Sequence, residues 1–341
     1  MVEFEAGELM LPIKSPEARL RWMAVFIEKL CSRADFPRTA MGERRDDDVF
    51  RMAASVLEGF AMTLSPDRIT ALRHRFRTLH ESGCFVLPNP WDRGSARWLA
   101  GQGHVALATT SSGCAWSLGR PDGGMTRGEV LDHLREMVAA TDLPVNADFE
   151  NGFGADPAAV AESVRMAVDT GVAGLSVEDS TGNPDHPLFD LDVAVTRLRA
   201  ARAAIDATGG DTLLVGRAEN FFVGRPDLGD TLVRLKAYAE AGADCLYAPG
   251  IRTREQIAAV VAAVAPKPVN LLIGWASDLT MADIAALGVR RVSVGGALAR
   301  SAWGGFMRAA RGLSEGRFDG FADAAPGAEL NAFFAGPPSS T

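Results

Sequence analysis

Two acidic residues separated by one position, Asp148 and Glu150, have the residue type and spacing of a metal site. Because they end a predicted strand, both carboxylates can reach one ion or its waters. Mg²⁺ typically keeps several waters and takes one or two carboxylates directly, and the substrate fills the remaining positions. We predict a Mg²⁺ site here, with Mn²⁺ as an alternative, in which Asp122 and Glu178 hold the waters. Each acid taken alone could instead cap a helix or pair with an arginine.

A basic residue and a Ser-Gly pair add anion-binding groups to these acids. Arg217 also ends a predicted strand, and its guanidinium could grip a substrate carboxylate with two parallel hydrogen bonds. A salt bridge from Arg217 to Glu219 or Glu178 is compatible with that role. Ser112 and Gly113 could offer a hydroxyl and a backbone N–H to an oxyanion or carboxylate; the less favoured alternative is that they form a simple turn.

Short apolar runs alternate with amphipathic helices from Ser65 onward, and these elements must position the site. The predicted strands are Cys84–Pro88, His104–Thr110, Leu143–Asp148, Gly174–Glu178, Thr212–Arg217, Asp244–Ala248, Pro268–Leu272 and Arg291–Val294. The predicted helices include Gly128–Ala140, Pro157–Thr170, Leu191–Ala207, Leu228–Ala241, Arg254–Val264 and Met281–Leu287. Eight such units over about 250 residues match an α/β fold of the closed (β/α)₈ TIM-barrel type, with catalytic groups at the C-terminal strand ends. The alternative, an open doubly wound sheet, lacks the expected GxGxxG motif after the first strand.

Residues 1–62 differ from the rest of the chain. They contain possible helices and a charged break at Arg44–Asp48, but no catalytic constellation. We therefore predict a helical or partly disordered N-terminal extension over 1–62 and a catalytic barrel over 63–341.

The composition narrows the classes of partner and compartment. The net charge of −8 leaves no basic surplus to neutralise the phosphates of a nucleic acid. No stretch approaches the roughly 20 apolar residues of a membrane span, and the acidic segment Met1–Glu5 lacks the basic start of a signal peptide. The four cysteines form no CxxC pair. We therefore expect a reduced, cytoplasmic protein without a nucleic-acid or membrane partner.

Taken together, the strand ends resemble the phosphoenolpyruvate mutase/isocitrate lyase family from about Ser65 to Phe334. The resembling stretches are Leu87–Asp92, Ala108–Gly113, Asn146–Gly152, Val177–Ser180, Gly242–Gly250 and Val289–Gly296. The resemblance implies Mg²⁺ and a small α-oxo or α-hydroxy carboxylate ligand that chelates it. The implied reaction makes or breaks a C–C or C–P bond next to an enolate. It also implies a homo-oligomer, either a dimer or a tetramer built as a dimer of dimers, in which the last helix is exchanged between subunits.

The same resemblance assigns roles to individual residues. It makes Asp148 the principal metal ligand within an acidic shell, and it makes Arg217 a carboxylate-binding group. Asn270 matches a substrate-binding asparagine of the lyases. The full set that it implies for substrate binding is Trp91, Asp92, Ser112, Gly113, Arg217 and Asn270, and for the metal Asp148, Asp122, Glu150 and Glu178.

The loop after the fourth strand departs from the family pattern. The lyases carry a catalytic cysteine there and the mutases a lysine, whereas this chain has the segment Thr181–Leu188 with neither. Pro249-Gly250 replaces a family glutamate after the sixth strand. His186 could replace the missing acid–base group, although a lone loop histidine could simply face solvent. Cys114 is a further candidate, or a small packing residue.

These observations predict a Mg²⁺-dependent carbon–carbon lyase acting on a small 2-oxo or 2-hydroxy carboxylate through an enolate. An oxaloacetate-like decarboxylation or cleavage is favoured because it needs less acid–base equipment. The expected catalytic residues are Arg217, Glu178 and His186. The alternatives are a C–P phosphonomutase or phosphonopyruvate-type hydrolase, and a barrel that binds a metabolite without turnover.

Overall fold

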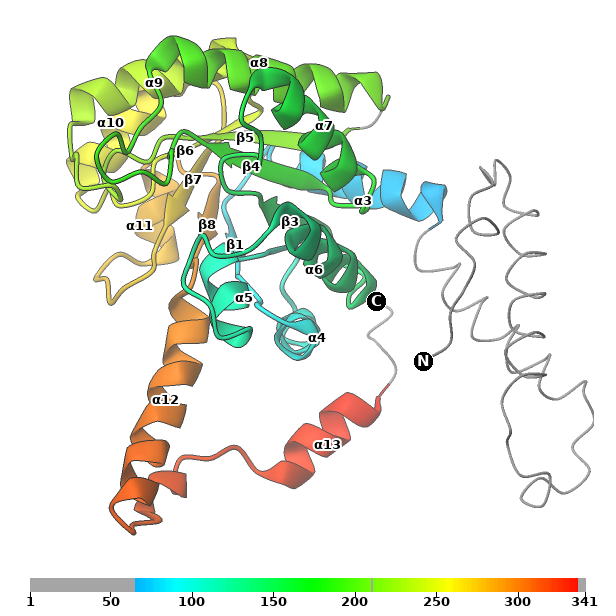
Figure 1. Ribbon diagram of the computed structural model, residues 1–341, viewed down its shortest axis with the longest axis vertical. Helices are drawn as coiled ribbons and strands as arrows, with labels where there is room; N and C mark the ends of the chain where they lie inside the picture. The colour runs from blue at the N-terminus through cyan, green and yellow to red at the C-terminus, as the bar shows by residue number, and fades with distance from the viewer. Residues whose placement is uncertain (1–64, 210, 337–341) are drawn as a thin grey trace, which may run out of the picture. The chain divides into compact units, whose positions relative to one another are not determined.

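Eight parallel strands form one sheet that curls into a barrel (Figure 1). The computed structural model describes residues 65–209 and 211–336. The strand order is β1-β8-β7-β6-β5-β4-β3-β2, and the Ala108 N–H donates to the Pro88 carbonyl at 3.0 Å between β2 and the end of β1. The predicted (β/α)₈ barrel is thereby confirmed. The strands are β1 (Phe85–Leu87), β2 (Leu107–Ala108), β3 (Val145–Asp148), β4 (Gly174–Glu178), β5 (Leu213–Arg217), β6 (Cys245–Tyr247), β7 (Val269–Leu272) and β8 (Arg291–Ser293).

Helices alternate with the strands and begin at polar capping residues. The predicted N-cap Ser65 accepts a hydrogen bond from the Arg68 N–H, and Pro66 occupies the first turn, where its missing N–H costs nothing. The six predicted helices agree with the structure to within two residues at each end, the usual uncertainty of helix boundaries. The helices are α3 (Pro66–Leu79), α4 (Arg93–Gly101), α5 (Ser111–Ser117), α6 (Arg127–Ala139), α7 (Pro157–Val168), α8 (Leu191–Ala207), α9 (Leu228–Glu240), α10 (Arg254–Val264), α11 (Met281–Ala286), α12 (Ala297–Ser314) and α13 (Gly327–Ala335), with a 3₁₀ turn η1 (Asp319–Phe321).

The second strand is shorter than predicted, and this matters for the site. It covers Leu107–Ala108 instead of His104–Thr110. Thr110 is the N-cap of α5, so its side chain accepts from the Gly113 N–H instead of continuing a strand. The expected Ser-Gly turn is therefore the first turn of a short helix.

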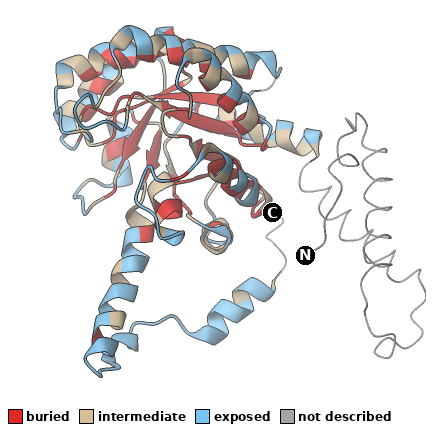
Figure 2. Ribbon diagram, viewed as in Figure 1, coloured by how far each residue is buried: buried red, intermediate tan, exposed pale blue. Residues whose placement is uncertain are grey.

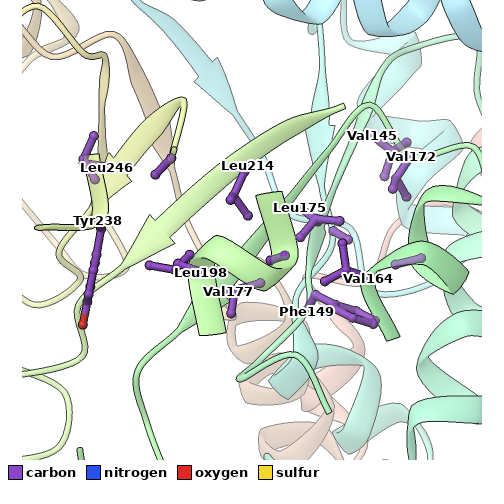
Figure 3. Close-up of a cluster of buried hydrophobic side chains, with 14 of the residues drawn as sticks. Val145, Phe149, Val164, Val172, Leu175, Val177, Leu198, Leu214, Tyr238 and Leu246 are labelled. Carbon is purple, nitrogen blue, oxygen red and sulfur yellow. The ribbon is translucent and has the colours of Figure 1, made fainter. Parts of the chain in front are cut away.

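Alternation along the strands separates an apolar outer face from an inner face that carries the polar residues of the site. Outward residues such as Leu175, Leu214 and Leu246 are fully buried against the surrounding helices, whose Val164 and Leu198 lie in the same cluster (Figure 3). Figure 2 shows the strands as the most continuously buried part of the chain. The inner face carries both apolar side chains, such as Leu87 and Leu272, and polar ones, such as Asn146 and Asn270, and it positions the site.

The chain after β8 leaves the barrel. Helix α12 projects away from the strands, and α13 follows after a further connection (Figure 1). Several large apolar side chains of this region are exposed, among them Phe306 at 62% and Phe318 at 70%. The Phe333 ring of α13 packs on Trp98 of α4 with ring centroids 4.7 Å apart. The expected extension over 1–62 lies outside the described residues, and no helix among those described is long and apolar enough to cross a membrane.

Candidate active site

A cavity of about 910 Å³ lies within the barrel and at the carboxyl ends of its strands. Its walls carry five carboxylates and four guanidinium groups, which leaves a formal excess of one negative charge before any ion binds. A divalent cation would reverse that sign and make the cavity attractive to an anion. The charged residues that line it are Asp122, Asp148, Glu150, Glu178, Glu219, Arg217, Arg252, Arg291 and Arg300.

Arg217, the last residue of β5, lies at the centre of the acidic group. Its Nη1 is 3.0 Å from Asp148 Oδ1 and 3.2 Å from Glu178 Oε2, and its Nε donates to Glu219. Burial alone would lower the pKa of Arg217, but the three carboxylates raise it above its usual value. The ion pairs to Glu178 and Glu219 that the sequence left open are therefore both present, and Arg217 fixes three carboxylates in one arrangement.

Asp148 is held on both sides of its carboxylate. Its Oδ1 faces Arg217, and its Oδ2 accepts from the Ser111 N–H at 2.9 Å. Its backbone N–H donates to Thr109 Oγ1 at 2.9 Å, which ties the end of β3 to the end of β2. These contacts fix the carboxylate before any ion arrives.

Asp122 and Glu150 are the remaining two carboxylates that line the cavity. Ser111 Oγ donates to Asp122 Oδ1 at 3.2 Å. Glu150 has a φ of 44°, in the left-handed region that is costly for a residue with a Cβ and that clusters at functional sites. Burial, followed by repulsion from Asp148 and Asp122, raises the pKa of Glu150 to about 7, and burial with Asp148 also raises the pKa of Asp122. These acids repel one another, and the nearby Arg217 offsets that repulsion only in part.

This donor set fits a hard divalent cation held mainly through water. No group of three or more His, Cys, Asp or Glu side chains within 65–209 and 211–336 converges closely enough to cage an ion directly. Mg²⁺ commonly takes one or two carboxylates and keeps its other positions for water and substrate. Asp148 would be the direct ligand, and Asp122, Glu150 and Glu178 would hold the waters.

Two further acids, both barely exposed, lie next to Arg217: Glu219 contacts its guanidinium, and Asp179 accepts from the Glu219 backbone. Glu219 is 5% and Asp179 2% exposed. Asp179 accepts from the Glu219 N–H at 2.8 Å, from Arg234 at 3.1 Å and from the Tyr238 hydroxyl. The sequence interpretation mentioned Glu219 only as a pairing partner and gave Asp179 no role. Their positions just past the ends of β5 and β4 were the available signal.

The predicted substrate-binding residues separate into two groups. Ser112 and Asn270 line the cavity, and Asn270 donates to Ser293 Oγ at 2.9 Å. Trp91, Asp92 and Gly113 are not among its lining residues.

Each residue of the second group has a structural contact instead. Asp92 caps α4 by accepting from the Ser95 N–H at 2.7 Å. A Cβ on Gly113 would lie 2.9 Å from the Trp91 Cβ, so glycine permits α5 to pack closely there. The Gly113 N–H already donates to its N-cap at 3.4 Å.

The two candidates for the missing acid–base group lie outside the cavity. His186 is exposed in the loop 181–188, of which only Thr181 and Gly182 line the cavity. Cys114 is 5% exposed, and burial raises the pKa of its thiol to about 11. Its surroundings are those of a packing residue.

The cavity also contains basic residues that the sequence interpretation did not single out. Arg252 stacks on the Trp275 ring at 4.2 Å, and Arg300 donates to the Gly274 carbonyl; both are exposed. Arg291, in contrast, is 2% exposed inside the barrel. A charged residue at the start of an apolar strand was the only signal for it in the sequence.

Comparison with known proteins identifies the family. The model of the phosphoenolpyruvate phosphomutase family matches residues 76–314. A crystal structure of a candidate lyase/mutase from Burkholderia cenocepacia J2315 is 49% identical, with a TM-score of 0.77, over 79% of this chain and 98% of that one. Oxaloacetate decarboxylase from Paraburkholderia xenovorans is 31% identical over 65% of this chain and 75% of its own length.

A further solved structure has a similar fold. Oxaloacetate acetylhydrolase in complex with the product oxalate is 28% identical with a TM-score of 0.68, over 78% of this chain and 94% of that one. The family match covers most of the barrel, including the strand ends that carry the acidic group. The chain therefore belongs to the phosphoenolpyruvate mutase/isocitrate lyase family of enzymes.

Proposed function

We propose that the protein is a divalent-metal-dependent lyase that cleaves a carbon–carbon bond of a small 2-oxo or 2-hydroxy carboxylate through an enolate. An oxaloacetate-like decarboxylation or cleavage is the favoured reaction. The observation that carries the proposal is the acidic group facing one cavity around Arg217, with Asp148 held between Arg217 and the Ser111 N–H. The named activities of the oxaloacetate relatives support the substrate class.

The residues of the chain divide the work between binding and proton handling. A bound Mg²⁺ or Mn²⁺ would polarise the 2-oxo group and offset negative charge on its oxygen. The Ser112 hydroxyl and the Asn270 amide are proposed to bind ligand oxygens, and Arg217 to keep the carboxylates oriented. In an oxaloacetate-like decarboxylation, the C–C bond breaks to release CO₂, and its electron pair stays on the carbon next to the oxo group as an enolate. We propose that Glu178 in its protonated form donates a proton to that carbon, which gives pyruvate.

The direct test measures Mg²⁺-dependent pyruvate release from a panel of 2-oxo and 2-hydroxy diacids. We expect turnover of at least one of them, loss of activity with EDTA, and recovery with Mg²⁺ or Mn²⁺. If no diacid turns over, yet one raises the melting temperature only with Mg²⁺, the barrel binds a metabolite without catalysis.

A second candidate is C–P chemistry on a phosphonopyruvate-like compound. The phosphomutase family match and the lyase/mutase structure favour it. The loop 181–188 disfavours it, because it contains no lysine. Formation of phosphoenolpyruvate, or release of phosphate, from phosphonopyruvate would identify this activity.

We also propose a homo-oligomer, a dimer or a tetramer, in which the region from α12 to α13 is exchanged between subunits. The exposed Trp303, Phe306 and Phe318 rings support it, since patches of this kind mark protein contacts. Light scattering with size exclusion should give a multiple of 36.2 kDa. The variant Phe306→Glu should shift the mass toward the monomer, and an unchanged mass would contradict exchange through this surface.

A further inference from the structure

Arg291 enters the barrel interior from the first position of β8 and lines the cavity. Its Nε donates to Asn270 Oδ1 at 2.9 Å, and its Nη1 lies 3.2 Å from Asn146 Oδ1 and 3.3 Å from His80 Nε2. Its second terminal nitrogen, Nη2, donates to no side chain or carbonyl of the described residues. One end of a buried guanidinium is thus left for a partner in the cavity.

All acceptors that the protein supplies to Arg291 are neutral. No carboxylate within residues 65–209 or 211–336 forms an ion pair with it, although arginine stays protonated in proteins. Burial lowers the pKa of Arg291, and only Cys245 and Tyr247 act against that effect. Burying a charge without a counter-charge is strongly unfavourable, so a full negative charge is missing here.

We propose that Arg291 and the Asn146–Asn270 amides form a second anion subsite that binds the far carboxylate or phosphonate of a dianionic ligand. The near end of that ligand, with its carboxylate and oxo oxygens, would lie at Asp148 and Ser112. The identity of the ligand as a substrate rests on the proposed function. The subsite makes Arg291 a specificity residue that selects small diacids over monoacids.

The spacing along β3 suits a small ligand. Asn146, which contacts Arg291, and Asp148, which contacts Arg217, lie two residues apart on the inner face of one strand. Two residues of a strand span about 7 Å. A diacid of three or four carbons therefore has the length to reach from Asp148 to Arg291. Of the two arginines at these ends, Arg217 already has carboxylate partners and Arg291 has none among the described residues.

A second buried arginine provides a matched control. Arg197 is also 2% exposed and forms no ion pair with a carboxylate of the described residues; it donates to the Asn151 carbonyl and lies over the Phe189 ring at 4.3 Å. It is not among the residues that line the cavity of about 910 Å³. Replacing Arg197 therefore removes a buried guanidinium without touching the proposed subsite.

The test compares ligand binding by calorimetry in the full chain with Mg²⁺. Malonate, succinate and phosphonoacetate are the multiply charged probes, and acetate and pyruvate are the monoanions. We expect the wild type to bind one or more of the multiply charged probes at least about tenfold more tightly than the monoanions. A hydrogen bond to a charged group contributes a difference of this size. The variant Arg291→Met should reduce this preference to about twofold or less, and Arg197→Met should keep it. The tighter of the carboxylate and phosphonate probes identifies the natural group.

A second variant covers the case in which Arg291→Met does not fold. Asn146→Asp places a carboxylate beside Arg291 at nearly unchanged shape, and it should abolish the preference for dianions while raising the melting temperature without ligand. A wild type with no preference, or an Arg291→Met or Asn146→Asp variant that retains it, overturns the proposal. Binding requires no turnover, so a preference that depends on Arg291 in a protein that cleaves no diacid would leave the subsite standing and overturn the proposed function. If diacids are turned over and Arg291→Met leaves kcat and KM unchanged, the proposed function stands and the subsite is overturned.

Discussion

Two arginines that line one cavity have opposite electrostatic surroundings. Arg217 contacts three carboxylates, whereas Arg291 contacts amide and imidazole groups and the Phe76 ring, and it forms no ion pair with a carboxylate of the described residues. The charge of Arg217 is used within the protein, where it orders the acids. The charge of Arg291 is left for the cavity. An arginine with neighbouring carboxylates thus orients them at the strand ends, whereas an arginine without them, deeper in the barrel, can bind a ligand anion.

The largest effect is expected from removing the charge of Asp148, one of the three acids that Arg217 orients. Asp148→Asn keeps the shape but loses the charge, so we expect kcat/KM to fall more than about 100-fold and the Mg²⁺ requirement to weaken. The measurement is pyruvate release across a Mg²⁺ titration. Asp92→Asn is the matched control because asparagine caps helices as well as aspartate does. If both variants lose activity alike, Asp148 has no special role and Asp92 belongs to the site.

Removing the cation tests the scaffold role of Arg217. Arg217→Met leaves three largely buried carboxylates without their shared cation, and breaking a buried ion pair typically costs about 3–5 kcal/mol. We expect that loss in the free energy of unfolding measured with urea at pH 7. The loss should shrink at lower pH as the acids become protonated. A variant as stable as the wild type would show that the ion pairs contribute little.

The surroundings of Arg291 predict a pH effect on stability. His80 Nδ1 lies 2.7 Å from the Phe76 carbonyl and its Nε2 faces Arg291, so the ring is neutral, donating from Nδ1 and accepting at Nε2. Burial, followed by Arg291, lowers the pKa of His80 from 6.5 to about 3. The unfolded chain therefore binds a proton between these pH values and the folded chain does not. Stability should fall as pH drops below 6.5, by up to about 1.4 kcal/mol per pH unit.

The measurement for His80 is urea unfolding at several pH values between 7 and 4. His80→Gln should flatten this slope relative to the wild type. Burial also lowers the pKa of His133, to about 4, so part of the slope will remain. An identical slope in both proteins would contradict the neutral state of His80.

The smallest effect is expected at the loop after β4. His186 is exposed and does not line the cavity, so His186→Ala should change kcat/KM by less than about twofold. Steady-state kinetics across pH 5–9 is the measurement. A loss of 100-fold or more would instead show that the loop reaches the ligand and that His186 is catalytic.

The sequence predicted the strands, six helices and the acidic strand ends, because each depends on local periodicity and on the position directly after a strand. It identified Asp148, Glu150, Glu178 and Arg217 as candidates, and the structure brings all four to one cavity. It could not foresee that Asp92 would cap a helix, or that Gly113 would serve close packing, since both depend on which residues lie opposite. Arg291 was missed because a buried charge without a charged partner leaves no pattern in the chain.

The hydrogen bond between His80 and Arg291 joins residues that are 211 positions apart. It lies where β1 pairs with β8, so the strands that meet there come from opposite ends of the barrel sequence. During synthesis from the N-terminus, α3 and β1 are made long before β8, so the interior polar layer can form only after β8 is made. A ribosome stalled before residue 291 would therefore hold a chain with most of its acidic residues made and no finished binding site.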